Sequence, residues 1–212
     1  MRTGARILAA GAGRRMGGRA KCLLRVQGHS LLQRLVHALR SLGQDTPVLV
    51  LGHHAHEIQA HLAQWPTHLT PSYVVNPAPE DDPASSLHIG LRALAGNVQT
   101  VVVLLADQPL INAADIEAAL DAFQRRPADC HVMRPVVSDV PGHPVVFDAS
   151  VRDHVLTSPG HGLRSWRAAH PMSTLLWVVD NPNYTRDLDT PEDLETLERE
   201  TGWVCRWPGL DP

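Results

Sequence analysis

The stretch "ILAAGAGRRMGGRAKCLL", residues 7–24, begins as an apolar strand and turns into a glycine-rich, basic loop. The loop ends at Lys21, the only lysine in a chain whose other basic side chains are all arginine. Glycines let backbone N–H groups approach an anion closely, and the guanidinium and ammonium groups supply positive charge. The stretch therefore predicts a phosphate-binding loop, with a basic surface loop that holds one lysine by chance as the alternative.

The glycine spacing matches neither of two widespread phosphate-binding loops. Gly11 and Gly13 could begin the dinucleotide pattern G-x-G-x-x-G, but its third glycine position holds Met16. Gly13 and Gly18 have the gap of the P-loop G-x-x-x-x-G-K-[ST], but Arg-Ala follows Gly18. The loop is therefore expected to bind phosphate in some other way.

Short apolar runs alternate with helical patterns along the rest of the chain. We expect strands at residues 6–10, 47–51, 73–75, 100–105, 131–137, 145–147 and 175–179. We expect helices from a Ser30 cap to Gly43, at 55–63, from Ser85 or Ser86 to 94, at 113–125, and after Thr190. This alternation predicts an α/β fold, with a mostly parallel sheet covered by helices on both faces and ligands at the carboxyl ends of its strands.

Composition narrows the class of protein. The 212 residues suit one domain, 1–212, with 43% hydrophobic and 19% charged residues. A net charge of −3 without long charged runs argues against a nucleic-acid partner, and no apolar run is long enough for a membrane helix. Three widely separated cysteines form no C-x-x-C pair, so we expect free thiols and a cytoplasmic location.

Four ordered motifs follow the opening L-A-A-G-x-G-x-R-M-G…K. They are N-P…S-S-L-x-x-G-L at 76–91, A-D-Q-P-L at 106–110, G-H-P-V-V-F at 142–147 and D-L-D-T-P-E-D-L at 187–194. In these motifs the chain resembles the nucleotidyltransferases of molybdenum cofactor biosynthesis, and among them the molybdenum cofactor cytidylyltransferases. The L-A-A-G opening and the D-Q-P-L turn favour cytidylyl over guanylyl transfer within this resemblance.

The resemblance implies a Rossmann-like nucleotidyltransferase fold. It also implies transfer of CMP from CTP to the phosphate of molybdopterin cofactor, with Mg²⁺ and release of pyrophosphate. A molybdoenzyme client or its chaperone would be a possible partner. Residues 1 to about 110 would bind the nucleotide, and residues from about 111 to 212 would bind the acceptor and supply a second metal ligand.

The expected chemistry needs positioned charge rather than a protein nucleophile, because the attacking phosphate oxygen is already anionic. Asp107, at the end of a buried strand, is expected to bind Mg²⁺, with a turn-initiating role as the alternative. Asp189 is the second expected ligand and Asp187 the fallback, although Asp189 could merely precede a helix start. Arg15 and Lys21 are expected to stabilise the triphosphate and the leaving pyrophosphate, so the predicted catalytic residues are Arg15, Lys21 and Asp107.

Further residues are expected to line the two substrate pockets. Asn76 and Ser86 could hold the base or ribose, and Gly52 is expected beside the nucleotide, or else forms a plain turn at a strand end. His143 and Pro144 are expected to edge the acceptor pocket, or else form a surface turn. The complete predicted nucleotide set is Leu8, Ala10, Gly11, Gly13, Arg15, Lys21, Gly52, Asn76 and Ser86.

Other functions remain open at this point. Four histidines fall between residues 53 and 61, but His56 and His61 would lie ~140° apart on a helix, so a partly solvated helix face is favoured over a zinc site. A related nucleotidyltransferase could use GTP or a sugar-phosphate acceptor. A non-catalytic protein that delivers molybdenum cofactor, or a nicotinamide-dependent oxidoreductase, would be a different class.

Overall fold

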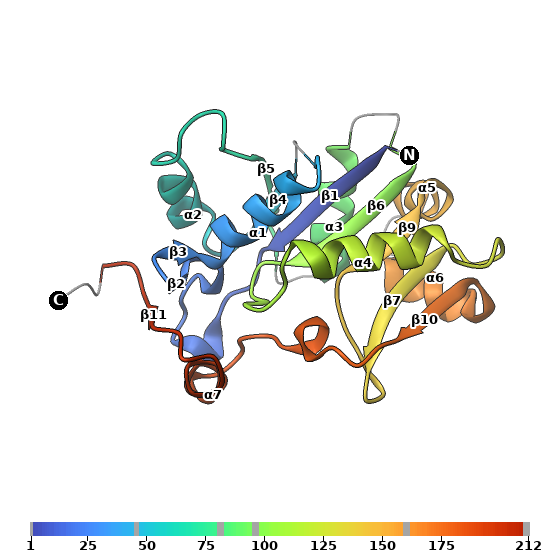
Figure 1. Cartoon of the computed structure of the whole chain (residues 1–212). Helices are drawn as coiled ribbons and strands as arrows, with labels where there is room; N and C mark the ends of the chain where they lie inside the picture. The colour runs from blue at the N-terminus through green and yellow to red at the C-terminus, as the bar shows by residue number, and fades with distance from the viewer. Residues whose placement is uncertain (1, 45–46, 80–82, 95–97, 159–161, 210–212) are drawn as a thin grey trace.

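A computed structural model describes residues 2–44, 47–79, 83–94, 98–158 and 162–209 (Figure 1). Its main sheet runs, from edge to edge, β10 (Thr174–Val178), β7 (Val132–Val137), β9 (Val145–Asp148), β6 (Thr100–Leu105), β1 (Thr3–Ala9), β4 (Val48–Leu51) and β5 (Ser72–Val75), and β8 (Val140–Pro141) pairs with β7. β1 is parallel to β4 and β6, β4 to β5, and β7 to β10, whereas β9 is antiparallel to both neighbours. The predicted mostly parallel sheet is confirmed.

Helices cover both faces of this sheet, as predicted. One hydrophobic cluster joins the sheet to α1 (Leu31–Ser41), α2 (Ala55–Leu62) and α4 (Ala113–Gln124). A second cluster on the other face joins it to α3 (Pro83–Arg92), α5 (Ala149–Thr157) and α6 (Leu163–Ala169). In Figure 1, α1 and α4 lie in front of β1 and β6, and α3 lies behind them.

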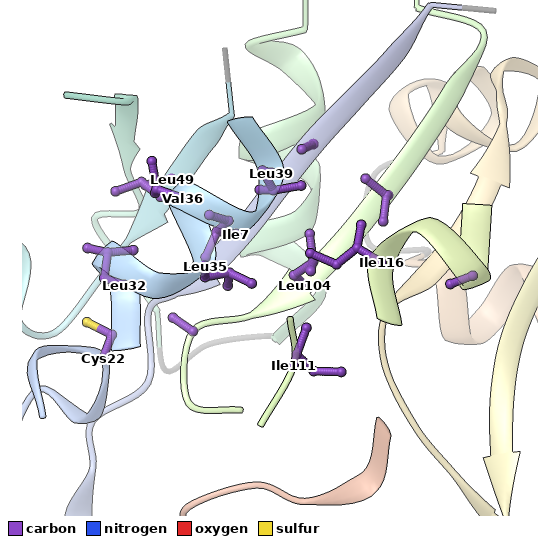
Figure 2. Packing of buried hydrophobic residues seen from close by; sticks show 14 of the residues in the cluster. Ile7, Cys22, Leu32, Leu35, Val36, Leu39, Leu49, Leu104, Ile111 and Ile116 are labelled. Atoms are coloured by element: carbon purple, nitrogen blue, oxygen red, sulfur yellow. The ribbon is translucent and has the colours of Figure 1, made fainter. Parts of the chain in front are cut away.

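Helix α1 shows how the local sequence builds the first layer. Ser30 caps it in a capping box: its hydroxyl accepts from the Gln33 N–H, and the Gln33 side chain accepts from the Ser30 N–H. Apolar side chains at helical spacing then face the sheet, and Leu32, Val36 and Leu39 are completely buried. Figure 2 shows this row packed against Ile7, Leu49 and Leu104 of the three central strands.

A second, three-stranded sheet lies beside the glycine loop. It orders β11 (Cys205–Arg206), β2 (Arg25–Val26) and β3 (His29–Ser30), all antiparallel. A third cluster joins it to α7 (Pro191–Thr201), with Leu24 and Val26 from the start of the chain and Leu188 and Leu197 from its end. This packing carries the C-terminal segment back to the loop that holds Lys21 (Figure 1).

Three expectations about local structure were incomplete or wrong. Ser85 and Ser86 lie inside α3, which begins at Pro83, so neither caps that helix. Helices α5 and α6 and strand β8 were not predicted. Strand β9 runs against its neighbours because the two-residue turn at Ser138 and Asp139, both with positive φ, reverses the chain after β7.

The described residues contain no helix long and apolar enough to span a membrane.

Asp148 joins β9 to α5 through several bonds. Its Oδ1 accepts from the Ser150 and Val151 N–H groups at the start of α5. Its Oδ2 lies 2.8 Å from His131 Nδ1 and 3.2 Å from Arg126 Nη2. Burial alone would raise the pKa of Asp148, but hydrogen bonds from Ser150, His131 and Val151 outweigh burial and lower it.

We expect Asp148→Asn to lower the free energy of unfolding by about 1–2 kcal/mol at pH 7, because asparagine keeps the helix cap but loses the charge. A carboxyl pKa that is lower in the folded state stabilises the fold above the unfolded value of about 3.9. That contribution disappears as pH falls through the folded pKa. Urea unfolding of both proteins at pH 7 and near pH 3 should show the difference shrinking at the lower pH, and a constant difference would contradict this account.

Candidate active site

The glycine loop folds back on itself directly after β1. Gly13 adopts a left-handed conformation with φ of 60°, and its carbonyl accepts from the N–H groups of Met16 and Gly18, each at 2.9 Å. Short 3-10 turns follow at Arg14–Met16 and Lys21–Leu23. The loop thus holds Arg15 and Lys21 at the carboxyl end of the central strand β1.

Lys21 stands between two carboxylates from distant parts of the chain. Its ammonium Nζ donates to Asp107 Oδ2, and it lies 2.9 Å from Asp189 Oδ1. Arg15 Nη2 lies 2.8 Å from the other carboxylate oxygen of Asp189. Four predicted site residues therefore meet in one ion-pair network.

Backbone contacts hold the two acidic segments together. The Leu188 N–H donates to the Asp107 carbonyl at 3.1 Å, which ties the turn after β6 to the strand-like segment before α7. Asp193, in the capping box of α7, accepts from the N–H groups of Asp189 and Thr190. Asp189 therefore precedes a helix start, as the alternative reading held, and also faces Lys21.

The pKa shifts follow from this crowding of charge. Burial would lower the pKa of Lys21, but Asp107 and Asp189 outweigh burial and raise it. The hydrogen bond from Lys21 lowers the pKa of Asp189. Burial, together with the charges of Asp107 and Asp189, raises the pKa of Asp187 to about 6.

The donor atoms at this place suit a divalent cation. Asp107, Asp187 and Asp189 offer carboxylate oxygens, which Mg²⁺ and Mn²⁺ prefer. Among the described residues, Asp187 Oδ1 is buried without a hydrogen-bond partner. No three acidic, histidine or cysteine side chains in the described part of the chain are grouped as a metal site, and Lys21 separates two of the acids. A cation held by Asp107 and Asp189 would therefore compete with Lys21 for the same carboxylates.

A cavity opens between the loop and the ends of β1 and β6. Four of its lining residues belong to the predicted site, namely Leu8, Gly11, Lys21 and Asp107. The remaining lining residues were not predicted and are Ala9, Ala20, Cys22, His54, Ile58 and Ala106. His54 lies in the turn after β4, where its Nε2 is 3.0 Å from the Ala12 carbonyl. Its position directly after a parallel strand was the feature of the sequence that could have marked it as a site residue.

The Cys22 thiol beside this cavity is buried and poorly suited to act as a nucleophile. Complete burial raises the pKa of Cys22 to about 12, and the Asp107 charge adds to this effect. The thiol therefore stays protonated near neutral pH. This agrees with chemistry that depends on positioned charge.

Other predicted residues lie around the same sheet edge. Gly52 approaches Ala10, and a Cβ at Gly52 would stand 2.6 Å from the Ala10 carbonyl oxygen. Asn76 is buried, and its amide donates to the hydroxyls of Ser85 and Ser86 at 2.8 and 2.9 Å. Asn76 thereby fixes α3 to the end of β5, and its contact with a nucleotide stays a prediction.

The predicted acceptor residues lie on the other side of Asp107. The His143 N–H donates to the Tyr184 carbonyl at 2.8 Å, and Gln108 Nε2 donates to the same oxygen at 3.1 Å. Pro144 is buried at the start of β9, after a cis peptide bond. The roles of His143 and Pro144 toward an acceptor stay predictions.

The histidines of residues 53–61 are dispersed. His53 and His56 are exposed, while His61 lies 3.2 Å from the Ser30 hydroxyl and meets Trp65 edge-on. Burial lowers the pKa of His61. These contacts account for His61 as a packing residue of α2.

Gly11 and Gly13 provide a matched pair of substitutions. A Cβ at Gly13 would collide with the Arg19 carbonyl and require positive φ, so Gly13→Ala is expected to destabilise the fold by about 1–3 kcal/mol. A Cβ at Gly11 would meet no protein atom within 4 Å. Gly11→Ala should therefore leave Tm nearly unchanged but raise KM for the nucleotide that we expect to bind in this cavity, because the methyl group enters the cavity. Thermal unfolding and nucleotide KM measured on both variants would check this, and a large loss of Tm in Gly11→Ala would contradict it.

Sequence comparison identifies relatives. The sequence model of the MobA-like NTP transferase domain matches residues 5–174. The bifunctional protein GlmU of Listeria monocytogenes is 30% identical over 141 residues, which are 65% of this chain and 29% of that protein. The chain thus spans less than a third of the length of this relative. Nicotine blue oxidoreductase of Paenarthrobacter nicotinovorans is 28% identical over 200 residues, or 91% of this chain and 92% of that protein.

Solved structures share the fold. A manganese complex of Rv0371c from Mycobacterium tuberculosis superposes with a TM-score of 0.72 at 24% identity, covering 95% of this chain and all of that one. The 4-diphosphocytidyl-2C-methyl-D-erythritol synthase of Anaerococcus prevotii gives 0.68 at 16% identity, covering 95% and 96%. Molybdopterin-guanine dinucleotide biosynthesis protein A of Archaeoglobus fulgidus gives 0.67 at 17% identity, covering 94% and 98%.

Proposed function

Because the chain belongs to the MobA-like NTP transferase domain family, we propose that it transfers CMP from CTP to the phosphate of molybdopterin cofactor and releases pyrophosphate. The family model and the fold identify the chain as a nucleotidyltransferase. The choice of CTP rests on the L-A-A-G opening and the D-Q-P-L turn. One structure of this fold carries diphosphocytidyl in its name and another carries molybdopterin-guanine dinucleotide, so these names support a molybdopterin acceptor and leave the choice between CTP and GTP to the sequence motifs.

One observation carries the proposal. Lys21 reaches Asp107 and Asp189 at the mouth of a cavity lined by the glycine loop. A triphosphate in this cavity would have N–H groups of the loop and the charges of Arg15 and Lys21 on one side. The carboxylates would lie on the other side, where a divalent cation could join them to the phosphates.

Each residue then has a defined part in the transfer. An oxygen of the acceptor phosphate attacks the α-phosphorus of CTP, the bond from that phosphorus to the bridging oxygen breaks, and pyrophosphate leaves with the electron pair. Lys21 and Arg15 stabilise the charge on the phosphates as it shifts toward pyrophosphate. Asp107 and Asp189, with Asp187 as the alternative, would hold Mg²⁺, which neutralises phosphate charge when bound.

Pyrophosphate release tests the proposal. The purified protein would be offered CTP, GTP, ATP or UTP with Mg²⁺ or Mn²⁺, each with and without molybdopterin cofactor. We expect release with CTP only when the pterin is present. Release with GTP or with a sugar phosphate would move the protein to a related nucleotidyltransferase, and no release with any pair would refute the proposed reaction.

A second candidate comes from the relative that matches over nearly its whole length, which is an oxidoreductase by name. An oxidoreductase on this fold would need a redox partner such as a nicotinamide cofactor. Against a nicotinamide site, Met16 replaces the third glycine of the dinucleotide loop. Binding of NADH or NADPH, measured by fluorescence titration in the absence of nucleotide triphosphates, would support this candidate.

A further inference from the structure

Two arginines and a histidine gather on the sheet face covered by α3, α5 and α6. Arg134 comes from β7, Arg167 from α6, and His143 from the segment before β9. Arg134 shares its side of β7 with Val132, which belongs to the cluster on this face. Arg134 Nη2 lies 3.2 Å from the Gly142 carbonyl, which places its guanidinium beside His143.

Arg134 and Arg167 have fewer partners than Arg6 and Arg126. Arg6 donates to two backbone carbonyls, and Arg126 pairs with Asp148. Among the described residues, neither Arg134 nor Arg167 forms an ion pair, and the Nε of each is buried without an acceptor. Two half-buried cations that lie near one another without a counter-ion are unfavourable unless an anion compensates them.

Burial lowers the pKa of all three groups, and the neighbouring guanidinium charge adds to this effect at Arg134 and His143. Burial, and then the charge of Arg167, lowers the pKa of Arg134 to about 10. Burial and both guanidinium groups lower the pKa of His143 to about 4. Near neutral pH the imidazole is therefore uncharged and can donate a hydrogen bond from one ring nitrogen, while both guanidinium groups remain charged.

The cluster is fixed to the turn that carries Asp107. The Tyr184 carbonyl accepts from both the His143 N–H and the side chain of Gln108, the residue after Asp107. Gly142 packs so closely on the same carbonyl that a Cβ there would collide with it. A ligand held by the cluster would therefore lie next to the carboxyl end of β6, where the acceptor is expected.

We propose that Arg134, Arg167 and His143 form a binding subsite for an oxyanion group of the acceptor, an inference that rests on the proposed function. A tetrahedral oxyanion has the charge that the two arginines lack and can accept from both buried Nε–H groups. In the proposed acceptor this group is either its phosphate or the oxygens bound to molybdenum. The three side chains lie on the opposite side of Asp107 from the glycine loop, so they bind the acceptor and do not themselves contact the triphosphate.

A direct binding test uses inorganic phosphate and molybdate as probes. Each would be titrated into a Lys21→Ala protein, so that the nucleotide loop contributes little, while Tm is recorded. We expect Tm to rise by about 3 °C near saturation. Adding Arg134→Gln or Arg167→Gln should remove at least half of that rise, whereas Arg125→Gln, an exposed arginine at the end of α4, should keep it.

Two results would overturn the subsite. One is an equal rise of Tm in the Arg134→Gln or Arg167→Gln protein and in its parent, which would put the oxyanion elsewhere. The other is no rise with either probe in the parent. Because each protein is compared with itself with and without probe, a general loss of stability does not imitate a loss of probe binding. Arg167→Lys is a further variant that keeps the positive charge.

Kinetics then separate the subsite from the proposed reaction. If CMP transfer occurs, Arg134→Gln and Arg167→Gln should raise KM for the acceptor about ten-fold or more and leave KM for CTP within about two-fold. An increase only with the molybdenum-loaded pterin would identify the molybdenum oxygens, and an equal increase with the metal-free pterin would identify the phosphate. If the parent transfers no CMP, the proposed function fails, while the probe titration still decides whether the oxyanion site exists.

Discussion

Replacing Lys21 by alanine is expected to lower kcat for nucleotidyl transfer about 100- to 1000-fold, the usual cost of removing one preorganised charge from a phosphate site. Lys21 is the centre of one ion-pair network: it contacts Asp107 and Asp189, and Asp189 in turn contacts Arg15. Its loss leaves the two carboxylates facing the triphosphate with one cation fewer. The measurement is pyrophosphate release under saturating CTP and acceptor.

Lys21→Arg separates charge from shape. The Lys21 side chain is only 15% exposed, and its compact ammonium reaches two carboxylates at once. A planar guanidinium is larger and fixes its donors in one plane. We therefore expect Lys21→Arg to restore less than about a tenth of the lost rate. Arg125→Ala, at an exposed position directly after α4, is the control and should keep full activity. Equal activity of Lys21→Ala and this control would remove Lys21 from the mechanism.

The α/β core could be predicted because its signals are local. The apolar row of α1, with a serine before it and a glycine after it, and the continuous apolar run of β6 each indicate an element without knowledge of the rest. Helices α5 and α6 give weaker signals. α5 buries Val151 and Val155, one helical turn apart, and α6 buries Trp166, so neither shows an extended apolar stripe. Their place is decided by the sheet face they cover.

The direction of β9 could not be predicted from its own residues. An apolar run such as Val145–Asp148 suits either direction, and the direction is set by the chain reversal at Ser138 and Asp139. That turn lacks glycine at both positive-φ positions, although glycine or asparagine would have marked it. The consequence reaches the site, because this reversal places His143 beside the end of β6.

The candidate site was predictable where it follows strands and not where it depends on packing. Lys21 and Asp107 come after β1 and β6, which are adjacent and parallel, so their meeting follows from the topology. Arg134 lies in the middle of a strand and Arg167 in a short helix, and nothing in either local pattern marks a binding residue. Only the packing of α6 on the sheet brings the two guanidinium groups together.

Asp107 is the residue whose loss should separate an enzyme from a carrier. Its carboxylate contacts Lys21, and its backbone carbonyl accepts from the Leu188 N–H at 3.1 Å. Asp107→Asn keeps the size of the side chain and the backbone contact but removes the negative charge. A divalent cation would then lose one of its anionic ligands, while Lys21 would keep only Asp189 as a charged partner.

We expect Asp107→Asn to reduce the rate of transfer about 1000-fold and to raise the Mg²⁺ or Mn²⁺ concentration needed for half-maximal activity. Titrating each metal into the variant and the parent, with pyrophosphate release as the readout, checks both effects. Thermal unfolding serves as the control, since the Leu188 contact persists and Tm should change by only a few degrees, about 2–4 °C per kcal/mol. A protein that merely delivers molybdenum cofactor would not need this charge. Full biological activity of Asp107→Ala in cells that lack the parent protein would therefore favour delivery over catalysis, because a carrier can hold its cargo without the carboxylate that transfer requires.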